Sequence, residues 1–183
     1  MTSAQRHHAP LVALALVVVA LGIFVSALLM NGGAKSQPLP ATGAGPTLVS
    51  QAQLARLAAA TDHPLYWAGP KKGYSYELTR TAGGRTYIRY LPGGVKAGDP
   101  RPNFLVIGTY AQSDSYAYLK RAGRAQDEIS LGIGNGGLAL FSAARTTNVY
   151  FTYPGAKYEV EVYDPSGDAA RRLVLGGKIV PLR

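Results

Sequence analysis

The first strong feature of the hydrophobic pattern is an uninterrupted apolar run, Leu11–Met30, that contains no charged residue and one polar residue, Ser26. A helix of twenty residues spans about 30 Å, which matches the hydrocarbon core of a bilayer. A surface helix of a soluble domain would carry a polar stripe, and this run has none. The pattern therefore predicts a transmembrane helix over residues 11–30.

The charges beside this run predict its orientation. Arg6 precedes it and Lys35 follows it. The positive-inside rule then leaves residues 1–10 as a short cytoplasmic tail and residues 31–183 outside the cell membrane. We expect a single-pass signal-anchor, although the small residues Gly32-Gly33-Ala34 leave open a cleavage after Ala34.

Two patterns follow the apolar run. Residues 31–46 read NGGAKSQPLPATGAGP, a composition typical of a flexible linker. From residue 47 onward the sequence alternates between helical and strand periodicities, so residues 47–183 are predicted to form one extracytoplasmic domain.

The first half of this domain is predicted to hold two helices and three longer strands. Ser50 and Gln53 form a capping box that begins a helix, which His63-Pro64 ends. Gly83-Gly84 marks the turn of a hairpin. The expected elements are a helix over 50–62, a short extended piece over 65–67, strands over 74–81, 85–91 and 104–110, and a helix from 113 or 114 to about 123.

The second half repeats this order. Asn135-Gly136 is a strong hairpin signal, and residues 158–163 alternate cleanly between Tyr158, Val160 and Val162 on one face and Glu159, Glu161 and Tyr163 on the other. Ser166 caps a helix that ends at Gly176-Gly177. The expected strands cover 129–134, 138–142, 148–153 and 158–163.

The order of elements predicts an α+β fold of antiparallel meanders, with about three helices segregated to one face of the sheet. The segment TYIRYLPGG (86–94) resembles NVYFTYPGA (148–156), and each is followed by a strand and a polar-capped helix. This similarity suggests an internal duplication, although strand–turn–strand–helix units also resemble one another by composition alone.

Composition narrows the chemistry of the domain. It has no cysteine and a single histidine, His63, which excludes disulfides, cysteine nucleophiles and zinc sites built from several histidines. Carboxylate pairs occur at Asp127-Glu128, Glu159/Glu161 and Asp164/Asp168, and two carboxylates can cleave a glycosidic bond. A solvated strand face explains Glu159 and Glu161 more simply. We therefore expect no metal, no cofactor and no catalytic residue, with a hydrolase or transferase that uses a carboxylate pair as an alternative.

The candidate binding residues depend on the register of the first hairpin. A two-residue turn at Gly83-Gly84 pairs Arg80 with Tyr87 and Leu78 with Arg89, which would gather basic and aromatic side chains on one strand face. That face suits an anionic partner through charge-assisted hydrogen bonds and stacking. A core position for the apolar members, with snorkelling arginines, is the alternative. The candidate residues are Tyr74, Tyr76, Arg80, Arg85, Tyr87 and Arg89.

Residues 47–183 carry 17 Lys and Arg, 10 Asp and Glu, and all 12 tyrosines of the chain, so the domain has a net charge of +7. A tail, an anchor, a linker and a Tyr-rich domain resemble the layout of envelope proteins of Gram-positive bacteria. We expect a membrane-anchored binding domain for an anionic envelope polymer, a lipid or a protein, and no nucleic-acid partner. A structural subunit of a membrane complex is a further alternative.

Overall fold

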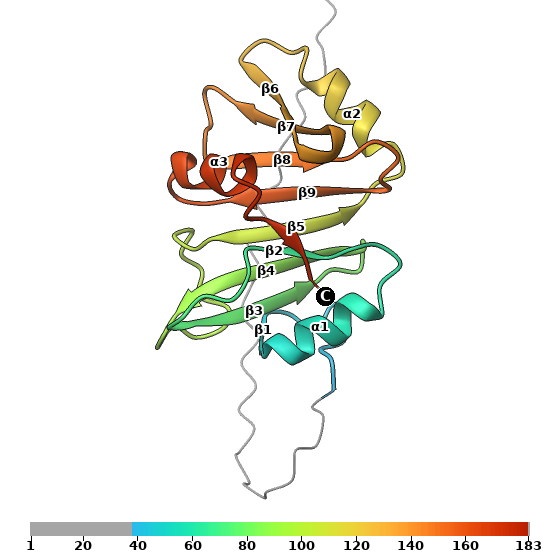
Figure 1. The fold of residues 1–183 in the computed structure, drawn as a ribbon. Helices are drawn as coiled ribbons and strands as arrows, with labels where there is room; N and C mark the ends of the chain where they lie inside the picture. The colour runs from blue at the N-terminus through green and yellow to red at the C-terminus, as the bar shows by residue number, and fades with distance from the viewer. Residues whose placement is uncertain (1–37, 183) are drawn as a thin grey trace, which may run out of the picture. The chain divides into compact units, whose positions relative to one another are not determined.

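The computed structural model describes residues 38–182, and this part of the chain is an antiparallel α+β domain (Figure 1). One eight-stranded sheet has the order β1-β3-β4-β5-β9-β8-β7-β6, and β10 pairs with β2 in a separate two-stranded sheet. The predicted fold class is therefore confirmed. The predicted tail, the transmembrane helix and residues 31–37 of the linker lie outside the described residues. Between residues 38 and 182, no helix is long and apolar enough to cross a membrane.

The observed elements match the predicted ones closely. Two short strands, β1 and β10, were not predicted, because two or three residues are too few to show a periodicity. The bounds are β1 Thr47–Val49, α1 Gln51–Ala59, β2 Tyr66–Trp67, β3 Tyr74–Arg80, β4 Arg85–Pro92, β5 Val106–Ala111, α2 Ser115–Ala122, β6 Glu128–Ile133, a 3₁₀ turn at Gly134–Gly136, β7 Gly137–Ser142, β8 Asn148–Thr152, β9 Tyr158–Tyr163, α3 Gly167–Leu175 and β10 Val180–Pro181.

Local signals fix the helix ends. In α1 the Gln53 amide nitrogen donates to Ser50 Oγ, and the Ser50 amide nitrogen donates to Gln53 Oε1 at 2.8 Å, which is the predicted capping box. Ser166 caps α3 by accepting a hydrogen bond from the Ala169 amide. After α3, Gly177 adopts a φ of +64°, which glycine tolerates without strain.

Strand alternation gives the large sheet two different faces. We call the face covered by α1, α3 and the β2–β10 pair the core face; Figure 1 views the sheet from this side. It holds one continuous hydrophobic cluster, in which alternating strand residues pack against Leu54 and Leu57 of α1 and Ala170 and Val174 of α3. We call the opposite side the outer face.

The prediction that the helices lie on one face is wrong, because α2 packs on the outer face. Ser115 Oγ of α2 lies 2.8 Å from Thr152 Oγ1, and Thr152 alternates along β8 with the core residue Phe151. Leu119 of α2 and Leu140 of β7 are both buried, yet neither belongs to the core cluster. A second, smaller apolar contact therefore holds α2 on this side.

The strand order bears on the suggested duplication. From the two edges inward it reads β1-β3-β4-β5 and β6-β7-β8-β9, and β5 meets β9 antiparallel at the centre. A two-fold repeat with antiparallel central strands would place α2 and α3 on the same face, whereas they lie on opposite faces. The strands thus fit a duplication and the helices do not, and the duplication stays a prediction.

Part of the expected linker packs on the domain. Leu39 is half-buried against the core cluster. Arg80 Nη1 donates to the Pro40 carbonyl at 3.3 Å, and the Gly43 amide donates to the Arg80 carbonyl at 2.7 Å. The folded part of the chain therefore includes residues before the expected boundary at 47.

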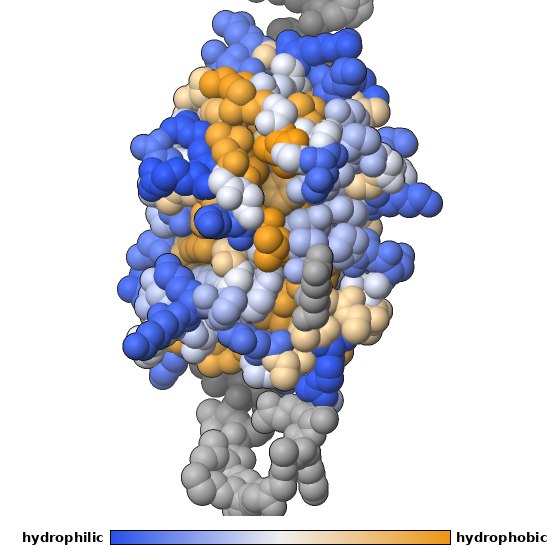
Figure 2. All heavy atoms as spheres, in the orientation of Figure 1, coloured by the Kyte–Doolittle hydropathy of each residue, from blue (hydrophilic) through white to orange (hydrophobic). Residues whose placement is uncertain are grey.

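The edge strand β6 carries two exposed apolar side chains. Ile129 is 39% exposed and Leu131 is 38% exposed, and Figure 2 shows hydrophobic atoms gathered over β6 and β7. A structural subunit would need an apolar surface of this kind, but that alternative stays a prediction.

Candidate functional site

The predicted register of the first hairpin is wrong by one residue. Arg80 pairs with Thr86, Leu78 with Ile88 and Tyr76 with Tyr90. The turn is a three-residue loop closed by a hydrogen bond from the Thr81 amide to the Arg85 carbonyl at 2.9 Å. Gly84 has a φ of +76°, whereas Gly83 does not have a positive φ. A two-residue type I′ turn needs a positive φ at both central positions, so the glycine pair forms the longer loop instead.

This shift divides the six candidate residues between the two faces. Tyr74, Tyr76 and Arg80 project on the core face, because they alternate with Glu77 and share a face with Leu78. Arg85, Tyr87 and Arg89 project on the outer face. The six residues therefore do not form one surface. Side chains alternate between the two faces of a strand, so a one-residue shift in register moves the residues of one strand to the other face relative to those of its partner. Whether any of them binds a ligand stays a prediction.

The core-face members mostly serve the fold. Tyr76 is buried, and its hydroxyl accepts a hydrogen bond from the Lys71 amide at 2.9 Å. Tyr74 and Tyr76 also line a shallow hollow of about 410 Å³ between β1, α1 and β3. Arg80 is held by Pro40, as described above.

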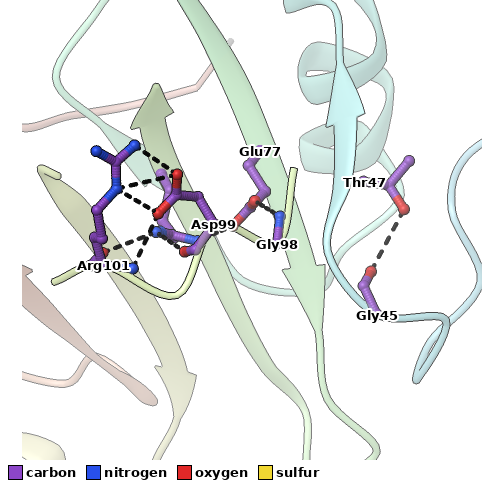
Figure 3. A network of polar contacts seen from close by, with 7 residues as sticks. Gly45, Thr47, Glu77, Gly98, Asp99 and Arg101 are labelled. Carbon is purple, nitrogen blue, oxygen red and sulfur yellow. Dashed lines mark hydrogen bonds and ion pairs between the residues drawn. The ribbon is translucent and has the colours of Figure 1, made fainter. Parts of the chain in front are cut away.

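On the outer face, Arg89 is committed to a covered ion pair. Its Nη1 atom lies 2.7 Å from Oε1 of Glu77, a side chain only 1% exposed. The Gly98 amide donates to Glu77 Oε2 at 2.6 Å, and Arg89 Nη2 donates to the Asp99 carbonyl at 2.8 Å. Figure 3 shows the loop that carries Gly98, Asp99 and Arg101 beside β3 and β4. We call this region, Glu77 and Arg89 with Gly98 and Asp99, the covered pair.

At the centre of the outer face, side chains from four strands converge. Across the sheet, Arg85 pairs with Tyr110 and Tyr110 with Glu159; in the next row Tyr87 pairs with Gly108, Gly108 with Glu161 and Glu161 with Tyr150. These pairings place polar and aromatic groups side by side. We call the polar and aromatic residues of these two rows, together with Asn148, the outer-face cluster. Its members are Arg85, Tyr87, Tyr110, Asn148, Tyr150, Glu159 and Glu161.

Glu161 is the hub of this cluster. Its carboxylate accepts hydrogen bonds from the hydroxyls of Tyr110 and Tyr150 and from Nδ2 of Asn148, and the Tyr150 contact measures 3.0 Å. Burial, and then the negative charge of Glu161, raise the pKa of both phenols. Both hydroxyls therefore keep their protons and act as donors to a well-satisfied carboxylate.

Gly108 makes room for this arrangement. A Cβ atom at this position would lie 2.8 Å from the Tyr110 hydroxyl and 2.9 Å from its ring carbon. The missing side chain thus lets the Tyr110 ring lie across its own strand and reach Glu161 in the neighbouring row. Tyr87 then packs edge-on against Tyr110, with ring centroids 5.6 Å apart.

Glu159 differs sharply from Glu161. It is only 9% exposed, and within residues 38–182 its carboxyl group makes no hydrogen bond or ion pair. Burial raises its pKa to about 7, assisted by the charge of Glu161 and opposed by the charge of Arg85. Arg85 stacks over the Tyr110 ring at 5.3 Å and likewise has no carboxylate partner. An acid without a hydrogen bond and an arginine that meets only tyrosines therefore share one row of the sheet.

Sequence reasoning identified Glu159 and Glu161 as a same-face pair, which the structure confirms, but missed Tyr110, Asn148 and Tyr150. These residues come from β5 and β8, and the pairing of those strands with β9 has no signal in the local pattern. The single histidine of the domain, His63, lies outside the cluster. Its ring is near that of Tyr158, which projects toward the core. In the part of the chain that the structure describes, no group of three or more His, Cys, Asp and Glu side chains could hold a metal.

The outer-face cluster is thus a polar, aromatic surface that contains one largely buried acid, Glu159, whose carboxyl group makes no hydrogen bond among the described residues. Such a surface can accept a hydrogen-bond donor at Glu159 and an acceptor at Arg85, and its three tyrosine rings can pack on the ligand between them. Comparison of the chain with protein-family models, with curated proteins and with solved structures finds no match.

Proposed function

We propose that the chain is a membrane-anchored, extracytoplasmic binding domain and that the outer-face cluster is its ligand-binding surface. The anchor is the apolar run Leu11–Met30. The observation that carries the proposal is Glu159, a side chain only 9% exposed whose carboxyl group makes no hydrogen bond within residues 38–182 and whose oxygens reach solvent. Partial desolvation of a carboxyl group that has no protein donor costs free energy, and a ligand that donates a hydrogen bond to the solvent-facing oxygens would offset that cost.

The expectation of an anionic partner rested on three arginines on one face. Two of them are engaged, since Arg80 holds the segment before β1 and Arg89 pairs with Glu77. Only Arg85 offers its guanidinium on the open part of the outer face, where two glutamates accompany it. We therefore assign binding to the cluster as a whole. The proposed ligand is still part of an anionic envelope polymer, a lipid headgroup or a protein.

The test uses the full chain in a non-ionic detergent, incubated with solubilised fractions of the envelope. Glu159→Gln keeps the size of the side chain and removes its charge. Its matched control is Glu128→Gln, the same substitution in edge strand β6, outside the cluster. We expect Glu159→Gln to weaken binding about tenfold, or about 1.4 kcal/mol, and Glu128→Gln to leave it unchanged. Equal binding by wild type and both variants would contradict the proposal.

A second candidate function is a hydrolase or transferase that acts with Glu159 and Glu161. It is favoured by one observation: Glu159, with a pKa raised to about 7, can donate a proton near neutral pH while Glu161 sits two residues away on the same strand face. Release of reducing ends from envelope polysaccharide, abolished by Glu159→Gln, would support catalysis. Binding of the polysaccharide without any turnover would support a binding function without catalysis.

A further inference from the structure

The row that contains Arg85, Tyr110 and Glu159 places a cation and an acid on either side of a tyrosine. Cross-strand neighbours have Cβ atoms about 5 Å apart, so Arg85 and Glu159 begin about 10 Å apart on either side of Tyr110. Tyr110 would ordinarily stand between them. Its ring instead lies over Gly108 to reach Glu161, as the short approach to the Gly108 Cβ position shows. The row therefore presents a cation and an acid with no aromatic ring standing upright between them.

The charges around this row exclude ligands that carry one sign only. A simple anion that reached Arg85 would also face Glu159 and Glu161, and like charges in close contact oppose binding. A simple cation would face Arg85 and a domain whose described residues hold 16 Lys and Arg against 10 Asp and Glu. A ligand that carries both a positive and a negative group reduces both penalties.

We infer that the outer-face cluster binds a short zwitterion, whose primary ammonium group pairs with Glu159 and whose acidic group pairs with Arg85. This inference rests on the proposed function of the cluster and names its ligand class. A protonated amine supplies the N–H donors that the Glu159 carboxylate lacks, and a phosphate or carboxylate accepts the planar fork of the Arg85 guanidinium. The ring of Tyr87, beside Arg85, packs against the carbon chain between the two charges, and the tyrosine rings favour the ammonium through cation–π attraction.

The probe is phosphoethanolamine, titrated calorimetrically into the full chain in a non-ionic detergent. Ethyl phosphate lacks the ammonium group, ethanolamine lacks the phosphate, and phosphocholine carries an ammonium without N–H donors. We expect phosphoethanolamine to bind at least tenfold more tightly than each of the three. Glu159→Gln and Arg85→Gln should each weaken its binding at least tenfold, whereas Glu128→Gln and Arg172→Gln should not change it.

The source of the zwitterion is separated by a competition arm. Displacement of bound phosphoethanolamine by phosphatidylethanolamine liposomes, and not by phosphatidylcholine liposomes, supports the inference with a lipid headgroup as the source. Binding of phosphoethanolamine without such displacement supports it with a soluble or polymer-borne zwitterion as the source.

Absence of phosphoethanolamine binding, or equal binding of ethyl phosphate, overturns the zwitterion inference. If the envelope fraction still binds in a Glu159-dependent way, the proposed function survives this failure. If neither ligand depends on Glu159, both fail together. Thermal melting of each variant, with a midpoint close to that of the wild type, shows that a loss of binding does not come from unfolding.

Discussion

The outer face of the sheet contains two glutamate–arginine–aromatic groupings that look alike in composition and differ in their contacts. In the covered pair, Glu77 is almost completely buried, meets Arg89 at 2.7 Å and accepts a hydrogen bond from the Gly98 amide. In the outer-face cluster, Glu159 is nearly as buried and has no such partner among the described residues. The same residue types thus form a closed structural contact at one place and an incomplete one at the other.

The difference shows that a buried charge indicates function only when its contacts are incomplete. An ion pair under a loop, with all its hydrogen bonds made within the protein, needs no role beyond stabilising the fold. An acid without a hydrogen bond beside a second carboxylate, and an arginine without a carboxylate partner, are free to bind another group.

The largest effect is expected from Glu77→Ala in the covered pair. The substitution leaves Arg89 beneath the loop without its carboxylate, and removal of one partner of a buried pair costs about 3 kcal/mol. Denaturant unfolding of the full chain measures the loss. The control is Asp168→Ala, which breaks the exposed pair with Arg171 and should cost no more than about 1 kcal/mol. Similar losses of unfolding free energy in the two variants would show that the Glu77–Arg89 pair stabilises the fold no more than an exposed ion pair does.

The second effect is a pH dependence that comes from Glu159. Its pKa rises from 4.5 in the unfolded chain to about 7 in the fold, so between these values the native state binds more protons than the unfolded state. Stability should therefore fall as the pH rises from 4.5 to 7, by about 3 kcal/mol in total. Glu159→Gln should remove this decline and make the protein more stable than the wild type at pH 8. Parallel stability curves for the two proteins would refute the assignment.

The third prediction concerns the glycine that shapes the cluster. Gly108→Ala places a methyl group against the Tyr110 ring, which should cost about 1–3 kcal/mol and weaken ligand binding by displacing Tyr110 from Glu161. Gly132→Ala is the control, because a Cβ there meets nothing within 4 Å. Unfolding and binding are measured for both variants. A Gly108→Ala protein with wild-type stability would mean that Tyr110 is free to move.

The smallest effect compares an arginine that holds a backbone carbonyl with one whose contacts are tyrosines. Arg80→Ala removes a hydrogen bond to the Pro40 carbonyl and should cost about 1 kcal/mol. Arg85→Ala should change the unfolding free energy by less than about 0.5 kcal/mol and act on binding instead. A larger stability loss at Arg85 than at Arg80 would assign Arg85 to the fold.

Much of the fold followed from local sequence signals. The Ser50–Gln53 capping box, the alternation of Tyr158–Tyr163 and the stop at Gly176-Gly177 each act within a few residues, and each is observed. The side of the sheet on which α2 lies did not follow. It depends on Leu119 meeting apolar partners on the outer face, and the amphipathic pattern of a helix does not say which surface it will cover.

The candidate site was less predictable for a physical reason. The first turn is a three-residue loop and not a two-residue turn, which shifts the hairpin by one residue and places Tyr76 and Tyr87 on opposite faces. The neighbours of Glu161 come from β5 and β8, which are distant in the sequence and meet β9 only through the sheet order. Local periodicity gave the direction of each side chain within its strand, but not which strands lie beside it.

The most direct test of the central claim compares Glu159→Gln with Glu77→Gln in the full chain, with both unfolding free energy and ligand binding measured for each. We predict that Glu159→Gln loses binding about tenfold and keeps or gains stability at pH 8. We predict that Glu77→Gln loses stability and, at a temperature where it remains folded, binds as the wild type does. A Glu159→Gln protein that binds normally, or a Glu77→Gln protein that loses binding while fully folded and stable, would contradict the division of the outer face into a structural pair and a binding cluster.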